Sequence, residues 1–487
     1  MPTPENPRRL PVIGAATLPL PASPLLAQRS ADATTGRVYI ERFGCQMNDY
    51  DVERLTEVLR RGGWERTDLV DEADLVLLET CAIREKAEAK VSSAAGRLKE
   101  WRAQPGRLLA IGGCVPQQEG RKLLQRIPHA DLAFGPDQIP NVAALLRQAQ
   151  SERRRIFATD VIDVEDYAFL DADPRPGEVS VTALVTIQKG CDNHCAYCVV
   201  PNTRGREVSR PADEVLAEVV RFVAAGAREV TLIGQNVNSY HGIRDREGLD
   251  PGDDFAELLR RVDAVPGLLR LRFTTSHPKD FTPAVARAFG ELPRLQPWLH
   301  LPVQSGSSRV LARMKRDYTQ EQYLAKLDEV RVHAPDISLS TDIIVGYPGE
   351  TLGDHQATLD LLERAQYDMI YSFAYSQRPN TSALDLADDV PSQEKSRRLQ
   401  EVQSVQRTIT NVRLARFVGR TLEVLVEGES RQGGQLCGRS GGNHMVNFPA
   451  PMGVAPDSLA GTVLAVRIEQ ARTSTLIGGE LLAGRVA

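Results

Sequence analysis

Short runs of β-branched and apolar residues alternate with amphipathic helical stretches in the first part of the chain. The β-rich runs cover residues 38–43, 74–79, 108–112 and 131–134, and the helical stretches cover residues 48–61, 84–101, 117–127 and 137–149. Strands and helices that alternate at this spacing predict a doubly wound sheet of parallel strands.

A second series of strands and helices follows a segment rich in Asp, Arg and Pro. The predicted strands of this series are residues 181–188, 229–233, 269–274, 298–301, 338–345 and 369–374. Six such units predict a partial (β/α)6 barrel, whose active face should lie at the carboxyl ends of the strands.

The pattern changes twice more toward the C-terminus. Residues 390–419 carry apolar positions at spacings of three and four, which predicts a helix. Short runs between residues 421 and 487 alternate with Gly and Pro turns, which is typical of a small antiparallel β-barrel. The chain is therefore expected to be an α/β protein with these parts: a disordered tail (1–36), an N-terminal domain (37–150), a linker (151–179), a central domain (180–416) and a terminal barrel (417–487).

Composition narrows the function classes. The chain has 487 residues and a net charge of −5, so any contact with RNA must come from a local patch. No apolar run approaches the roughly 18 residues of a membrane span, and we expect no membrane partner. Seven prolines interrupt residues 1–36, which favours a cytoplasmic tail over a targeting peptide.

Three cysteines lie within eight residues in the pattern C-x3-C-x2-C: Cys191, Cys195 and Cys198. Structural zinc sites and ordinary iron–sulfur clusters are closed by four protein ligands, so this tripod leaves one coordination position for a small molecule. The alternative is a zinc site whose fourth ligand is His194 or a distant residue.

A second set of cysteines is spread along the N-terminal domain. Cys45, Cys81 and Cys114 each directly follow one of three successive predicted strands. Because parallel strands present their carboxyl ends at one edge of a sheet, we expect the three thiols to meet there and to hold a second open cluster. A single cysteine at such a position would more simply be a small buried hydrophobe.

Several motifs carry a family resemblance. The C-x3-C-x2-C tripod with Tyr197 before its last cysteine resembles the radical S-adenosylmethionine (SAM) superfamily. The segments FGCQMNDYD, TCAIREKAEAKV, GGC, CVVPNTRGREVSRP, LPVQSGSSRVLARMKRDYT and TDIIVGYPGET are similar to the methylthiotransferases of that superfamily. The resemblance implies two 4Fe-4S clusters, one per triad, with Cys191, Cys195 and Cys198 as the catalytic set.

The resemblance also implies a reaction. The central cluster would reduce SAM to release a 5′-deoxyadenosyl radical, and a methylated sulfur would come from the N-terminal cluster, so both triads should face one cavity. An electron donor such as flavodoxin or ferredoxin and a separate sulfur donor would be required. The resemblance implies that SAM binds at the barrel edge, in contact with Gln235, Ser276 and Gln304.

The C-terminal segments indicate a site that binds RNA. Residues 394–420 contain seven basic residues against two acidic ones, and we expect Arg407, Arg413 and Arg416 to contact tRNA. The terminal barrel resembles the TRAM domain, an RNA-binding barrel, in which Arg439 would contact phosphate or a base edge.

Within the family, the motifs are nearest to enzymes that add a methylthio group to C2 of N6-isopentenyladenosine beside the anticodon of tRNA. The same chemistry on threonylcarbamoyl-adenosine in tRNA, or on an aspartate of a ribosomal protein, remains an alternative. A non-catalytic iron–sulfur protein that binds RNA is a different class, and it predicts clusters closed by four protein ligands and no SAM binding.

Overall fold

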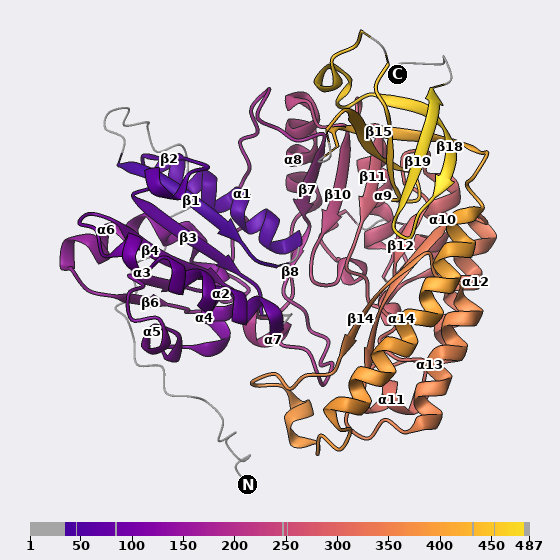
Figure 1. Ribbon diagram of the computed structural model, residues 1–487, viewed down its shortest axis with the longest axis horizontal. Coiled ribbons are helices and arrows are strands. Elements are labelled where there is room, and N and C mark those ends of the chain that lie inside the picture. The colour runs from indigo at the N-terminus through magenta and orange to yellow at the C-terminus, as the bar shows by residue number, and fades with distance from the viewer. Residues whose placement is uncertain are drawn as a thin grey trace.

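The computed structural model describes residues 35–44, 46–82, 85–245, 248–250, 252–430, 433–451 and 453–481. The tail expected over residues 1–36 lies outside this description apart from its last two residues, and so does Cys45. Figure 1 places the N-terminal domain on one side of the central barrel and the terminal barrel at its upper end. None of the described helices combines the length and the apolar character that crossing a bilayer requires.

The N-terminal domain is a six-stranded parallel sheet in the order β2-β1-β3-β4-β5-β6. Its strands are β1 (Gly36–Arg42), β2 (Trp64–Arg66), β3 (Leu75–Thr80), β4 (Leu108–Gly113), β5 (Leu132–Phe134) and β6 (Ile156–Ala158). The sequence analysis did not predict β2 and β6, which are edge strands of three residues each and too short to show an alternating pattern. Strand β6 lies within the expected linker and pairs with β5, so the sheet extends into that segment.

Helices cover both faces of this sheet, as a doubly wound fold requires. One face packs against α1 (Gln46–Arg61) and α6 (Val142–Glu152), which follows the 3-10 helix η2 (Pro136–Asn141). The other face packs against α2 (Glu85–Arg97), α3 (Lys99–Arg102), α4 (Cys114–Glu119) and α5 (Lys122–Arg126). The helix expected over residues 117–127 is two helices, because Gly120 takes a φ of +66° after α4.

The central domain contains two three-stranded parallel sheets that continue each other around a partial barrel. One sheet has β7 (Thr182–Thr186), β10 (Glu229–Ile233) and β11 (Arg270–Phe273), and the other has β12 (Trp298–His300), β13 (Ser338–Val345) and β14 (Met369–Ala374). A single parallel bridge between Leu271 and Leu295 joins the halves. The six strands agree with the six predicted units.

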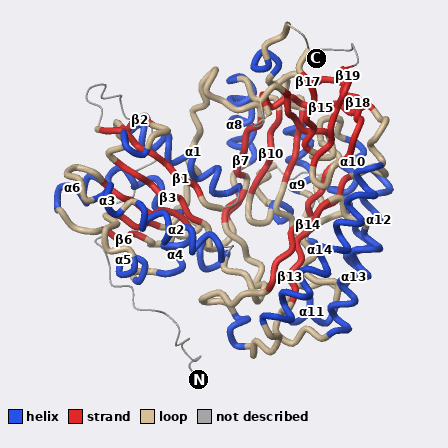
Figure 2. Tube along the Cα trace, in the orientation of Figure 1, coloured by secondary structure: helices blue, strands red, loops and turns tan. Residues whose placement is uncertain are grey.

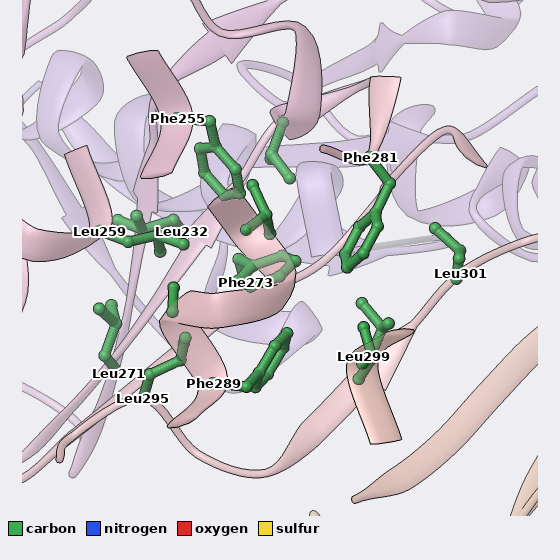
Figure 3. Close-up of a cluster of buried hydrophobic side chains, with 14 of the residues drawn as sticks. Leu232, Phe255, Leu259, Leu271, Phe273, Phe281, Phe289, Leu295, Leu299 and Leu301 are labelled. Atoms are coloured by element: carbon green, nitrogen blue, oxygen red, sulfur yellow. The ribbon is translucent and has the colours of Figure 1, made fainter. Parts of the chain in front are cut away.

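Helices surround the barrel strands on the outside, as Figure 2 shows. They are α8 (Ala212–Ala225), α9 (Asp254–Asp263), α10 (Pro283–Glu291), α11 (Ser308–Arg313), α12 (Gln320–His333), α13 (Leu352–Ala365) and α14 (Ser392–Ala415). The core between them is rich in aromatic rings, and Figure 3 shows Phe273 of β11 between Phe255 and Phe289. The rings of Phe255 and Phe273 meet edge to face with centroids 5.0 Å apart. This packed layer gives the strand ends a rigid base.

The terminal barrel is closed by five strands in the order β15-β16-β17-β19-β18. They are β15 (Thr421–Glu429), β16 (Gln435–Ser440), β17 (Met445–Pro449), β18 (Val463–Ala471) and β19 (Thr475–Leu481). Strands β17 and β19 pair in parallel, so the barrel is not wholly antiparallel as expected. Between β17 and β19 the chain forms β18, which pairs antiparallel with both β15 and β19, so β19 runs in the same direction as β17.

Candidate metal centres and the cavity between them

Cys81 and Cys114 lie at one edge of the N-terminal sheet. Each directly follows its strand, β3 or β4, and the last residues of these two strands are paired in the parallel ladder. Cys81 is 1% exposed and Cys114 is 4% exposed. A Cβ atom added to Gly44 would lie 2.4 Å from the Cβ atom of Cys81, so the end of the β1 segment lies against this cysteine. That Cys45 belongs to the same triad stays a prediction.

A buried amide ties the start of α1 to the same edge. Asn48 is fully buried, and its Nδ2 atom donates to Glu79 Oε1 and to the Thr80 carbonyl oxygen, both at 3.0 Å. The Thr80 hydroxyl donates to the Gly112 carbonyl oxygen at 2.6 Å. These bonds link α1, β3 and β4 next to the cysteine positions and hold the strand ends together.

The central cysteines lie on a loop between two short elements, β8 (Gln188–Lys189) and α7 (Val200–Thr203). Gly190 opens the loop with a φ of +74°, and a Cβ atom there would lie 1.9 Å from the Arg206 carbonyl oxygen. Only glycine fits this position. The Gly190 amide donates to Gln235 Oε1 at 2.5 Å, so the loop is fixed to the carboxyl end of β10.

Two basic side chains approach Cys195. Arg316 Nη1 donates to its Sγ atom at 3.4 Å, and His277 Nε2 lies 3.7 Å from it. Burial raises the pKa of Cys191 to about 11 and that of Cys198 to about 12. Thiols with such pKa values ionise at neutral pH only when a metal compensates the charge, which fits three thiolates that bind iron.

His194, the fourth ligand of the zinc alternative, is exposed on this loop. Within the described ranges, no three His, Cys, Asp or Glu side chains converge as the ligands of one metal ion would. The three thiolates that hold a 4Fe-4S cluster each bind a different iron atom, so they lie farther apart than the ligands of a single metal ion.

The three residues expected to grip SAM follow consecutive barrel strands: Gln235 follows β10, Ser276 follows β11 and Gln304 follows β12. The Ser276 hydroxyl oxygen is buried and has no hydrogen-bond partner within the described part of the chain. Gln304 has a φ of +75° and Thr275 has a φ of +72°, which is strained for residues with a Cβ atom. Unsatisfied polar atoms and strained backbone concentrate at functional sites, but contact of these residues with SAM stays a prediction.

Two polar residues at this edge, Asn238 and Asp280, were not expected from the sequence. Both amide atoms of Asn238 are buried, and neither has a hydrogen-bond partner among the described residues. Asp280 accepts hydrogen bonds from Asn236 at 2.7 Å and from Asn193 at 3.3 Å, which links the loop after β10 to the cysteine loop. The run QNVN directly after an apolar strand was the available signal for Asn238.

One cavity is lined by Cys114 of the N-terminal domain and by residues that follow the central cysteine loop. It is partly open, and its volume of about 620 Å³ includes open solvent. Its lining comes from both domains: Gln46, Met47, Cys114, Val200, Thr203, Arg204, Ile233, Gly234, Gln235 and Thr275. Cys114 of the N-terminal edge therefore faces the same space as the chain that leaves Cys198, and Figure 1 shows α4 beside α7.

The residues expected to contact RNA have different surroundings. Arg407 is exposed on α14. Arg413 and Arg416 instead donate to the buried carboxylate of Asp368 at 3.1 Å and 3.0 Å. Arg439 pairs with Glu427 at 2.9 Å on the terminal barrel. An arginine whose guanidinium is held by a buried carboxylate of the same chain has fewer donors left for phosphate, so Arg407 is the candidate best placed for RNA.

The terminal barrel is docked on the amino ends of the central strands. Arg272 pairs with Glu229 at 2.9 Å and also donates to the Ser440 and Gly441 carbonyl oxygens at 2.8 Å each. His444 Nε2 lies 3.0 Å from Ser338 Oγ. The loop that follows Arg439 therefore touches the central domain along one side.

Burial lowers the pKa of His444 to about 4. The charged groups that face its ring come from three elements: Asp368 raises the pKa, whereas Arg416, Arg413 and Arg272 lower it. The ring is therefore neutral in the folded protein at neutral pH.

Comparison with known sequences agrees with this division of the chain. The sequence model of the Radical SAM superfamily matches residues 185–362, that of the TRAM domain matches residues 415–479, and that of "Uncharacterized protein family UPF0004" matches residues 37–135. The chain is similar to two proteins named tRNA-2-methylthio-N(6)-dimethylallyladenosine synthase. The one from Anaeromyxobacter sp. (strain K) is 48% identical, and the alignment covers 92% of this chain and 95% of that protein. The one from Myxococcus xanthus is 45% identical, and the alignment covers 91% of this chain and 94% of that protein. The chain belongs to the methylthiotransferase family of radical SAM proteins.

A solved structure supports the fold of this methylthiotransferase family member. The radical S-adenosylmethionine methyltransferase TsrM from Kitasatospora setae, solved with cobalamin and a [4Fe-4S] cluster, aligns with a TM-score of 0.53 at 15% identity. The alignment covers 71% of this chain and 76% of that one. The sequence relatives confirm the family resemblance, and this alignment with the parallel sheets confirms the α/β fold class predicted from sequence.

Proposed function

We propose that the protein adds a methylthio group to C2 of N6-dimethylallyladenosine, also called N6-isopentenyladenosine, in tRNA. The observation that carries this proposal is the cavity lined by Cys114 on one side and by Gln235 and the chain after Cys198 on the other. A space lined by a cysteine of one set and by the chain that follows the other set suits a reaction that joins radical formation to sulfur transfer. The names of the relatives at 45–48% identity support the substrate.

In this proposal Cys191, Cys195 and Cys198 hold one 4Fe-4S cluster, and Cys45, Cys81 and Cys114 hold the other. C2 of adenine bears an unactivated C–H bond, which no acid or base side chain removes at neutral pH. SAM and the central cluster, when bound, supply a carbon-centred radical able to abstract that hydrogen.

The residues of the chain itself bind and orient the reactants. Arg316 donates to the sulfur of Cys195 and so helps to orient this ligand. The unpaired Ser276 hydroxyl and Asn238 amide are placed to receive polar groups of SAM at the strand ends. The apolar side chains of Met47, Val200 and Ile233 line the cavity and limit the water beside a reactive radical.

The reaction consumes electrons and sulfur. We propose a small electron-transfer protein such as flavodoxin or ferredoxin and a separate sulfur donor as partners. No group on the described chain could replace the electrons or the sulfur that each turnover consumes. A tRNA substrate places the enzyme in the cytoplasm in our proposal.

Mass spectrometry of tRNA nucleosides tests the substrate. Cells that lack the protein should accumulate N6-dimethylallyladenosine, and cells that regain it should contain the 2-methylthio derivative. A gain of methylthio groups on threonylcarbamoyl-adenosine instead would move the assignment to the sibling tRNA reaction, and a modified ribosomal aspartate would move it to protein. A Cys81→Ala/Cys114→Ala variant should still form 5′-deoxyadenosine from SAM but no methylthio product.

A further inference from the structure

The helix that directly follows position 45 presents one face to the central domain. Met47, Tyr50, Asp51 and Arg54 of α1 recur at the spacing i, i+3, i+4, i+7, and all four are buried. Helical residues at this spacing share one side of the helix. The adjacent side of α1 packs in the core of its own domain through Leu55 and Leu59.

The face toward the central domain has an apolar part. Met47 and Tyr50 form a cluster with Ile233, the last residue of β10, and with Leu184 of β7. Ile233 lies two residues before Gln235, so the cluster lies beside the cavity between the cysteine sets. Apolar contact of this kind favours association but leaves the two surfaces free to slide, because it has no direction.

A buried charge pair removes that freedom. Arg54 Nη2 of α1 donates to Glu218 Oε1 of α8, and the two side chains are 3% and 0% exposed. The other oxygen of Glu218 accepts a hydrogen bond from Arg210 Nη1 at 2.5 Å, and the Arg210 side chain is fully buried. A shift of either domain would leave a buried charge uncompensated, which is far more costly than the loss of a surface pair.

Two further pairs join the cysteine-bearing segments themselves. Arg204, six residues after Cys198, meets the carboxylate of Asp51 at 3.2 Å and 2.5 Å through its two terminal nitrogens. Lys189, two residues before Cys191, pairs with Asp137 Oδ2 at 2.7 Å. In both pairs the side chains are buried. Both ends of the central cysteine loop are therefore fixed to the N-terminal domain.

We propose that these buried ion pairs, with Arg54 and Glu218 farthest from the chemistry, are positioning residues that set the separation of the two cysteine triads for sulfur transfer. The proposal rests on the proposed function, because only a reaction that uses both triads needs a fixed distance between them. Catalytic groups misplaced by about 1 Å lose about 100-fold in rate. SAM cleavage needs the central triad alone and is indifferent to that distance.

A double variant separates this role from a general role in folding. Arg54→Met with Glu218→Gln removes the charge pair from both sides. The amide oxygen that the second substitution introduces can still accept from Arg210, and Arg210 keeps its ion pairs with Asp171 and Glu214, so no buried charge is left alone. The matched control is Arg102→Met with Asp131→Asn, which removes a charge pair inside the N-terminal domain. Both variants are compared with the parent after anaerobic reconstitution of the clusters.

Two measurements are made on each protein: the methylthio product formed per 5′-deoxyadenosine, and the magnetic interaction between the two reduced clusters by electron paramagnetic resonance. We expect the double variant to cleave SAM within about twofold of the parent while its product per 5′-deoxyadenosine falls about tenfold to 100-fold. The magnetic interaction should weaken or broaden in the same variant, and the control should match the parent in both measurements.

Each other outcome counts against the proposal. An unchanged product ratio with both clusters loaded would show that the pair does not set the distance. Equal loss of SAM cleavage and product would show that the pair supports the central site itself. A parent that forms no methylthio product at all would instead refute the proposed function. An Arg54→Lys variant, which keeps the charge, should recover most of the product ratio if the pair acts as argued.

Discussion

Asp368 is expected to hold the end of α14 and the terminal barrel against the central domain. It directly precedes β14 and accepts hydrogen bonds from Arg413 at 3.1 Å, from Arg416 at 3.0 Å and from the Leu339 amide at 3.0 Å. Its exposed fraction is 4%. Replacing it with Asn keeps the shape of the side chain and removes the charge that both guanidinium groups share.

The size of the effect follows from burial. Breaking a buried ion pair by removing one partner costs about 3–5 kcal/mol. The side chains of Arg413 and Arg416 are 21% and 20% exposed, so water compensates part of the loss and we expect about 2–3 kcal/mol. Since about 1.4 kcal/mol corresponds to a tenfold change in an equilibrium constant, local opening should become about 30-fold to 150-fold more frequent.

Hydrogen exchange measured by mass spectrometry tests this expectation. Peptides from the end of α14 and from residues 440–444 should exchange faster in Asp368→Asn, whereas peptides from the N-terminal sheet should not change. Asp360→Asn, the same substitution at an exposed position of α13, is the control. Unchanged exchange in both segments would refute the argument that Arg413 and Arg416 serve docking, and would return them to RNA contact.

Three other predictions can be tested with single preparations. Alanine at Cys191, Cys195 and Cys198 should halve the iron of the reconstituted protein and abolish SAM cleavage; loss of all iron would contradict two independent clusters. Arg407→Glu should weaken tRNA binding and lower the slope of log K against log salt by about 0.7–0.9, and an unchanged slope would move the RNA site elsewhere. Because the pKa of His444 is lowered from 6.5 to about 4 in the folded protein, the unfolded chain binds more protons between these values. Stability should therefore fall by about 3 kcal/mol as pH drops from 6.5 to 4, and His444→Asn should remove that part of the dependence in urea unfolding.

The barrel strands illustrate what could be predicted from the sequence. Strands β10, β13 and β14 have the predicted bounds, because each is a run of at least five residues that is rich in apolar and β-branched side chains. Strands β2 and β6 have three residues each, and their pairing depends on neighbours that a local pattern does not contain. The position of Cys81 and Cys114 at one edge followed from topology alone, since parallel strands end on the same side.

The basic residues of α14 show why the rest of the site could not be predicted. A run rich in arginine indicates a cationic surface, but whether a guanidinium meets phosphate or a carboxylate of the same chain depends on Asp368, which lies 45 residues before Arg413. The same holds for α1, whose Asp51 and Arg54 look like an ordinary solvated helix face in the sequence. Their partners, Arg204 and Glu218, lie more than 150 residues away. A charged residue can occupy a position that faces the core in an otherwise amphipathic helix. Such a residue is therefore better interpreted as one member of a buried ion pair whose partner lies on a different domain. In this protein such pairs join the two domains that carry the cysteine sets.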